Sequence, residues 1–237
     1  MGPRCRGACA PALLCMLLAY AGGCRDNSAG PVAQPGSTVQ GLFFAQGDSL
    51  TFDAWTIDSL DYVVESSHAA LTWSVAGVNG VFAGADNVTA IKESFAAGSP
   101  SATTDTLRFR FLPSGDIEQY GFIAQVVRRR EGISLPAAWD RIAAFSLPTN
   151  ATWVVGAVDS AGNDTMRGTV LGDQGYFIAL LNGVRTVFHA YGVGLSSQDI
   201  QYTIAVSGTP PAVLLIREEG TYRARGLLRV LSAIAVR

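Results

Sequence analysis

Residues 200–206 read IQYTIAV, and this stretch shows the pattern that decides the fold. Large apolar side chains occupy the even-numbered positions, whereas Gln201, Thr203 and Ala205 occupy the positions between them. Successive side chains of a β-strand point to opposite faces of a sheet, so such alternation over six or more residues predicts a strand with one buried face. The stretch is therefore expected to pack on one side and to meet water on the other.

The same alternation recurs along the chain, for example in residues 71–76 (LTWSVA) and 106–111 (TLRFRF). Asn182-Gly183, between two apolar runs, is the strongest short signal for a hairpin. The runs together predict roughly ten to twelve strands in the whole chain, and the spacing of about ten residues per strand from residue 150 onward predicts a meander of antiparallel hairpins. Sequences rich in Gly, Asn, Asp, Pro and Ser separate the runs and predict turns at 113–116, 159–163, 172–175 and 182–183.

A sheet with this many strands does not stay flat. The sequence therefore predicts a mainly β fold, in which a long antiparallel meander curls into a barrel or half-barrel, with a β-sandwich as the alternative. Residues 41–237 are predicted to form this single β-rich domain. One short helix is predicted near 136–144, because Pro136 can begin a helix and Trp139 and Ile142 would share one side of it.

The first 23 residues have the layout of a secretory signal peptide. Arg4 and Arg6 supply positive charge, and residues 8–21 are apolar apart from one tyrosine. This run of about 14 residues is too short to span a bilayer, which needs roughly 20. Two cleavage positions are open, because Ala19-Tyr20-Ala21 fits the site of ordinary secretion and a second site lies before Cys24.

Residues 21–24, Ala-Gly-Gly-Cys, resemble the bacterial lipobox, in which an aliphatic residue and two small residues precede a cysteine. The resemblance implies cleavage before Cys24, a diacylglycerol thioether on its sulfur and acylation of the new amino terminus. The cysteine count favours this interpretation, because Cys5, Cys9 and Cys15 would leave with the signal peptide. Without the lipid, Cys24 would remain as an unpaired thiol in an oxidising compartment. Several acyl chains on one cysteine would give a stable membrane anchor.

Residues 24–40 are predicted to comprise the lipidated cysteine and a flexible tether, because Ser, Gly, Pro, Asn and Gln dominate and little can be buried. In bacterial lipoproteins an acidic residue directly after the cysteine marks retention in the inner membrane, and this chain has Arg25 there. The resemblance therefore implies a cell envelope protein that is lipid-anchored in the outer membrane and faces the periplasm, with secretion as the alternative.

A second resemblance concerns the folded part. The step from strand through Gly-Val-Gly-Leu to strand in residues 188–207 is similar to one in uncharacterised bacterial envelope lipoproteins, as is the run from Trp139 through Phe145 to Trp153. The resemblance implies a curled antiparallel sheet and no established activity.

The charge pattern gives no reason to expect nucleic acid as a partner. The chain has 17 Lys and Arg against 19 Asp and Glu, and two of the arginines lie in the predicted signal peptide. His68 and His189 are the only histidines and form no metal-binding spacing, so neither a metal nor a cofactor is expected. No Gly-x-Ser-x-Gly motif accompanies them, so no catalytic residue is expected.

Two groups of side chains are candidate contacts for a ligand or partner. The four tryptophans could line an apolar pocket, although core packing is their simplest use. A run of three arginines is predicted to end a strand, where its charges would block edge pairing or meet anionic head groups. The candidates are Trp55, Trp73, Trp139, Trp153, Arg128, Arg129 and Arg130.

These patterns favour a membrane-anchored, non-enzymatic bacterial lipoprotein that binds an apolar ligand or an envelope partner. A structural or assembly lipoprotein that acts through surface contacts is the alternative. A hydrolase with an unrecognised site, gathered around His68 or His189, is the third candidate.

Overall fold

The computed structural model describes residues 43–58, 60, 62–95, 105–220 and 225–236. The predicted signal peptide, Cys24 and the whole predicted tether lie outside these residues. Among the described elements, no helix is long and apolar enough to cross a membrane. The strands are β1 (Ser49–Asp58), β2 (Val63–Phe82), β3 (Ala85–Phe95), β4 (Asp105–Phe111), β5 (Ile117–Tyr120), β6 (Trp139–Ala143), β7 (Thr152–Ala157), β8 (Thr165–Leu181), β9 (Val184–Ser196), β10 (Ile200–Gly208), β11 (Pro211–Gly220) and β12 (Arg225–Ala235), and the helix is α1 (Phe122–Glu131).

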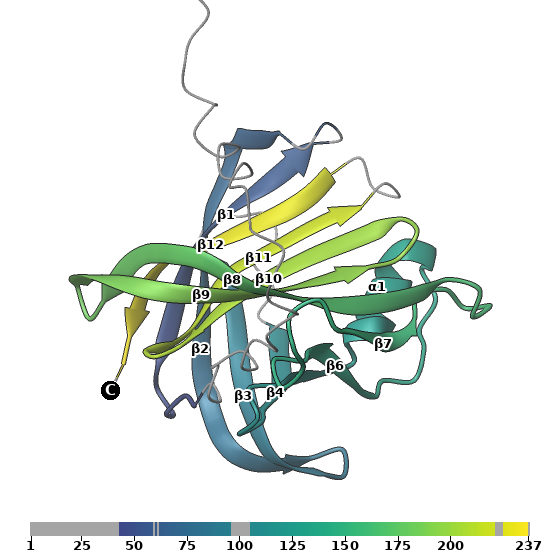
Figure 1. Cartoon of the computed structure of the whole chain (residues 1–237), viewed down its shortest axis with the longest axis horizontal. Coiled ribbons are helices and arrows are strands. Elements are labelled where there is room, and N and C mark those ends of the chain that lie inside the picture. The colour runs from purple at the N-terminus through teal and green to yellow at the C-terminus, as the bar shows by residue number, and fades with distance from the viewer. Residues whose placement is uncertain (1–42, 59, 61, 96–104, 221–224, 237) are drawn as a thin grey trace, which may run out of the picture. The chain divides into compact units, whose positions relative to one another are not determined.

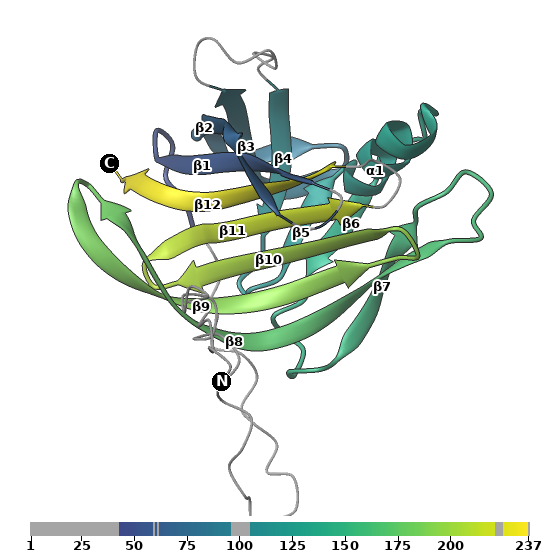
Figure 2. The same cartoon turned by 90° about the horizontal axis from the view of Figure 1, so that it is seen from above.

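The described strands form a single sheet in the order β6-β5-β4-β3-β2-β1-β12-β11-β10-β9-β8-β7. Neighbours in this order are antiparallel. They are also consecutive in the chain, except where β1 pairs with β12, and the consecutive strands β6 and β7 form the two edges. The end of β12 also pairs in parallel with β8, through Ala233 and Leu180, so the sheet curls and closes only in part (Figures 1 and 2). The predicted curled antiparallel meander is confirmed, and the alternative of a two-sheet sandwich is wrong.

The predicted hairpin at Asn182-Gly183 is confirmed. Both residues have positive φ, 49° and 80°, as a two-residue turn between right-twisted strands requires. Leu181 and Val184 close the turn as the last pair of β8 and β9. The turn predicted at 172–175 is wrong, because these residues lie within β8, where the register with β9 shifts twice. Glycines inside a strand mark bulges as well as turns, and here the bulges let a 17-residue strand bend with the sheet.

The helix predicted near 136–144 is wrong, because Trp139–Ala143 is strand β6 and pairs with β5. The helix is α1, whose residues 128–130 we expected at the end of a strand. Its buried positions Phe122, Ile123, Val126 and Val127 recur at helical spacing, and Gly132 ends it at a φ of 74° with its N–H bonded to the Arg128 carbonyl. Three arginines in the last turn also suit the negative end of the helix dipole.

The concave face of the sheet carries the core. Leu50, Phe52, Leu71, Ile91 and Phe188 are fully buried on it. Helix α1 packs against β6 and β7 at one end of this face (Figure 1). The alternation of apolar side chains therefore has the predicted effect, because the inward-pointing side chains of different strands pack against one another inside the curled sheet.

Trp153 connects the edge strand β7 to β6 and to β8. Its indole Nε1 donates a hydrogen bond to the Arg141 carbonyl on β6 at 2.8 Å. Gly168 lies directly opposite it on β8, and a Cβ added there would lie 2.2 Å from the indole ring. The ring can lie across the strand only because position 168 has no side chain.

We predict that Gly168→Ala lowers the free energy of unfolding by about 1–3 kcal/mol, because the new methyl group must displace a packed ring. Thermal and urea melts followed by tryptophan fluorescence measure the loss. Gly194→Ala on β9 is the matched control, since a Cβ there would meet only Leu171, at 3.7 Å. Equal melting of the two variants would show that this tryptophan does not need its glycine.

Candidate functional site

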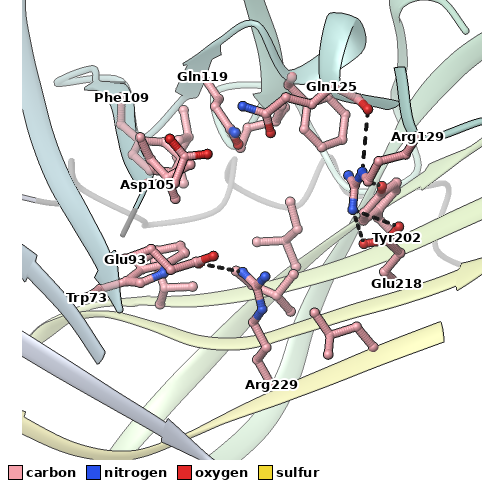
Figure 3. A pocket seen from close by; sticks show the side chains of 18 of the residues that line it. Trp73, Glu93, Asp105, Phe109, Gln119, Gln125, Arg129, Tyr202, Glu218 and Arg229 are labelled. Atoms are coloured by element: carbon pink, nitrogen blue, oxygen red, sulfur yellow. Dashed lines mark hydrogen bonds and ion pairs between the residues drawn. The ribbon is translucent and has the colours of Figure 1, made fainter. Parts of the chain in front are cut away.

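A cavity of about 470 Å³ lies on the concave face of the sheet. Residues of β2 to β6 line one side, residues of β10, β11 and β12 line the other, and α1 contributes from one end (Figure 3). Its volume falls within the range of about 300–1,000 Å³ that is usual for small-molecule sites. The apolar part of the wall includes Phe109, Phe111, Ile204, Val213, Ile216 and Leu227.

Strand register brings these side chains to one face. Ile204 lies opposite Ile216, and Ile216 lies opposite Arg229 on the far side of β11. One extra residue in β11, Leu214, shifts the alternation, so that Val213 and Ile216 both line the cavity. The wall therefore depends on a bulge as well as on simple alternation.

The first polar cluster of the wall centres on Glu93. Its Oε2 accepts a hydrogen bond from Trp73 Nε1 at 2.7 Å and forms an ion pair with Arg229 Nη1 at 3.1 Å. The side chains of Arg229 and Glu93 are only 17% and 14% exposed. Because both charges are largely withdrawn from water, each depends on the other for compensation, while the buried Nε of Arg229 has no hydrogen-bond partner among the described residues.

The second polar cluster joins α1 to the opposite wall. Arg129 Nη1 pairs with Glu218 Oε2 at 2.9 Å, and Arg129 Nη2 donates to the Tyr202 hydroxyl at 3.1 Å. Phe122 of the helix meets the Tyr202 ring edge-on, with 5.2 Å between the ring centroids. These contacts hold the helix to β10 and β11, so they help to fix the width of the cavity.

Of the predicted contact residues, the structure brings Trp73, Arg128 and Arg129 to the cavity. Arg130 points elsewhere, with Nη1 2.7 Å from Asp164 and Nη2 2.7 Å from Asp199. These acids, and first the hydrogen bond to Asp164, raise the pKa of Arg130 above its ordinary value. The interpretation of the three arginines as a charged strand end is thus wrong, since they end α1, and two of them form ion pairs with the sheet and its loops.

The other predicted residues lie apart from the cavity. Trp55 is half-buried on β1 and packs beside His68, with 5.1 Å between the ring centroids. Trp139 meets Tyr120 edge-on at 5.4 Å, and Trp153 lies across β8 as described above. Cys24 lies outside the described residues, so its lipidation stays a prediction.

Both histidines pair with aspartates rather than with a serine. His68 Nε2 lies 2.9 Å from Asp53 Oδ1, and His189 Nε2 lies 3.0 Å from Asp173 Oδ2. Asp199, the acid nearest to His189 in the sequence, pairs with Arg130. The Gly175 backbone N–H and then His189 hold the pKa of Asp173 below its usual range.

Sequence reasoning missed Gln119, Glu93, Glu218 and Arg229, although the alternation contains a signal for them. Each is a polar residue on the apolar face of its strand: Arg229, for example, stands between Leu227 and Leu231. Gln119 is in phase with Ile117, is only 8% exposed and points into the cavity (Figure 3). A polar side chain at an inward position must find a partner in the protein or in a ligand.

Asp140 ties the start of α1 to the sheet. Gly121, at the N-cap, has no side chain to offer, and Asp140 Oδ2 on β6 accepts a hydrogen bond from the Ile123 N–H at 2.9 Å. Burial raises the pKa of Asp140, and the backbone N–H groups of Ile123 and Phe122 offset part of that rise. The carboxylate thus caps the helix that lines the cavity, at the cost of desolvating a charge.

We predict that Asp140→Asn gains stability relative to the wild type as pH rises. A raised folded-state pKa means that the acid favours the fold below its unfolded value of 3.8 and loses that contribution as pH rises through the folded value. Asparagine keeps an acceptor for the Ile123 N–H without the charge. Urea denaturation of both proteins between acidic and neutral pH measures the difference, and a difference that falls with pH would contradict the assignment. Asp140→Ala is the control: it should show the same pH dependence relative to the wild type and, because it lacks the acceptor, should be about 1 kcal/mol less stable than Asp140→Asn at every pH.

No family model matches the chain, and no curated protein matches it. Among solved structures, it is similar to a candidate lipoprotein from Parabacteroides distasonis, with a TM-score of 0.39 and 8% identity over 82% of this chain and 98% of that one. It is also similar to a candidate exported protein with a YmcC-like fold from Bacteroides fragilis, with a TM-score of 0.41 and 10% identity over 83% and 99% of the two chains. No functional assignment follows from similarity at this level.

Proposed function

We propose that the protein is a non-enzymatic bacterial envelope lipoprotein, anchored through Cys24, that binds an apolar ligand in the cavity on the concave face. The cavity is the observation that carries the binding half of the proposal. Its walls combine aromatic and branched aliphatic side chains with a few polar groups, which is the usual make-up of small-molecule sites.

The anchor half of the proposal rests on the first 24 residues of the sequence. A charged start, an apolar run and Ala-Gly-Gly before a cysteine support lipidation of Cys24. Arg25 in the next position supports placement in the outer membrane, with the domain in the periplasm. Secretion without lipid is the alternative that the mass of the processed protein distinguishes.

The first test is the intact mass of the membrane-extracted protein. We expect it to lack residues 1–23 and to carry diacylglycerol and an additional acyl chain on Cys24. Cys24→Ser should carry neither modification, whereas Cys15→Ser, within the predicted signal peptide, should be processed normally. A wild-type protein cut after Ala21 and without lipid would overturn the anchor.

The second test uses an alkane that bears a photoreactive diazirine, added to membranes that hold the full chain. We expect labelling on peptides that contain Phe109 and Ile204. The double variant Ile204→Trp and Ile216→Trp adds two large rings to paired positions of the adjacent strands β10 and β11. Because the rings clash with a bound chain, at a cost of about 1–3 kcal/mol, labelling of the cavity should fall about tenfold.

The matched control for this test is the double variant Ile178→Trp and Val187→Trp. These residues also form a cross-strand pair on adjacent strands, but their side chains are exposed to solvent. Labelling of the cavity should therefore stay at the wild-type level. Thermal melts of both double variants check that they fold. Absence of any label from the cavity of the wild-type protein would overturn the binding proposal.

A second candidate function, an assembly lipoprotein that acts through surface contacts, is favoured by the outer face of the β8–β9 hairpin. Tyr176, Ile178, Leu180 and Val187 share this face and are exposed, at between 43% and 73%. Exposed apolar side chains that gather on one element are typical of a protein-contact surface.

A further inference from the structure

The charges of the cavity wall balance and are mostly paired with one another. Arg229 pairs with Glu93, and Arg129 pairs with Glu218, in both cases at about 3 Å. The remaining lining charges, Arg128 and Asp105, belong to residues exposed to solvent. An ionised group that entered the cavity would lose its hydration and would disturb the charge balance of buried groups that already pair with opposite charges.

Among the described residues of the wall, Arg229 Nε is buried without a hydrogen-bond partner, and the most buried uncharged side chain without one is that of Gln119. Its side chain points into the cavity, the residue is 92% buried, and it makes no side-chain hydrogen bond with the residues that the structure describes (Figure 3). A glutamine amide offers two donors and one acceptor. Because the amide opens onto the cavity, a ligand that fills the cavity must supply complementary groups or leave the amide unpaired, which costs about 1–3 kcal/mol.

The cavity wall around Gln119 has an apolar part and a hydrogen-bonding part. Phe109 lies directly opposite Gln119 in the β4–β5 pairing, and Phe111 lies opposite Ile117 one step further along. Gln125 lines the cavity from α1 and is a second uncharged amide of the wall. Carbonyl and hydroxyl groups satisfy amides without bringing a charge into the cavity.

From this arrangement we infer that the ligand is an uncharged amphiphile, whose apolar chain lies against the aromatic and aliphatic wall and whose carbonyl or hydroxyl group bonds to Gln119. The inference rests on the proposed binding function and adds the charge of the ligand and the residue that selects it. A long-chain monoacyl ester of glycerol has this chemistry, whereas a fatty acid or an alkylamine of the same length does not.

The test compares four diazirine-bearing probes of equal chain length on membranes that hold the full chain: an alkane, a monoacylglycerol, a fatty acid and an alkylamine. We expect the monoacylglycerol to label the cavity peptides most strongly. Gln119→Leu should lower its labelling about fivefold, which corresponds to one lost hydrogen bond of about 1 kcal/mol. The same variant should leave alkane labelling unchanged or increased, which shows that the cavity is intact.

Gln201→Leu, on an exposed position of β10, is the matched control and should label as the wild type does. Stronger labelling by the fatty acid or the alkylamine would overturn the inference, and so would unchanged monoacylglycerol labelling of Gln119→Leu. Either result would leave the proposed binding function standing if the alkane still labels the cavity. Failure of all four probes would refute the proposed function itself.

Discussion

The apolar concave face of the sheet is the constraint on which the rest of the structure depends. Twelve described strands alternate inward and outward side chains, so together they present an apolar surface that must be removed from water. The pairing of β1 with β12 joins the two ends of the meander at the middle of the sheet, and the short parallel contact of β12 with β8 bends one half back on itself. Each of these pairings covers part of the face, and α1 covers another part at one end.

Partial closure explains why a cavity remains. The strands on the two sides of the curl approach each other over the large core residues, but between β2–β6 and β10–β12 their side chains do not fill the space. Two ion pairs and the Arg129–Tyr202 contact lie along this gap and fix its width. An apolar space bordered by paired charges favours apolar matter over ions, which is the physical basis of the proposed function.

The proposed anchor and the proposed cavity suit each other. A tether of sixteen residues has a mean reach of about 20–24 Å, so a lipidated Cys24 would keep the domain close to a bilayer surface. Uncharged amphiphiles are most concentrated at such a surface. A domain held there would exchange them with the membrane over a short distance, and a cavity without a net charge would discriminate against the ionic lipids that surround it.

The sequence by itself determined the fold class, the curl and the hairpin at Asn182-Gly183, because alternation and turn chemistry are local properties of the chain. It did not place the helix, which was predicted at 136–144 and lies at 122–131. Residues Trp139–Ala143 form a strand because they pair with β5, and such pairing between separate segments is not visible in local sequence. The sequence also did not assemble the cavity. Glu93 and Arg229 are separated by more than half of the chain, and a bulge at Leu214 decides which side of β11 faces inward. Contacts between distant strands depend on register, and register is settled only when the whole sheet closes on its apolar face.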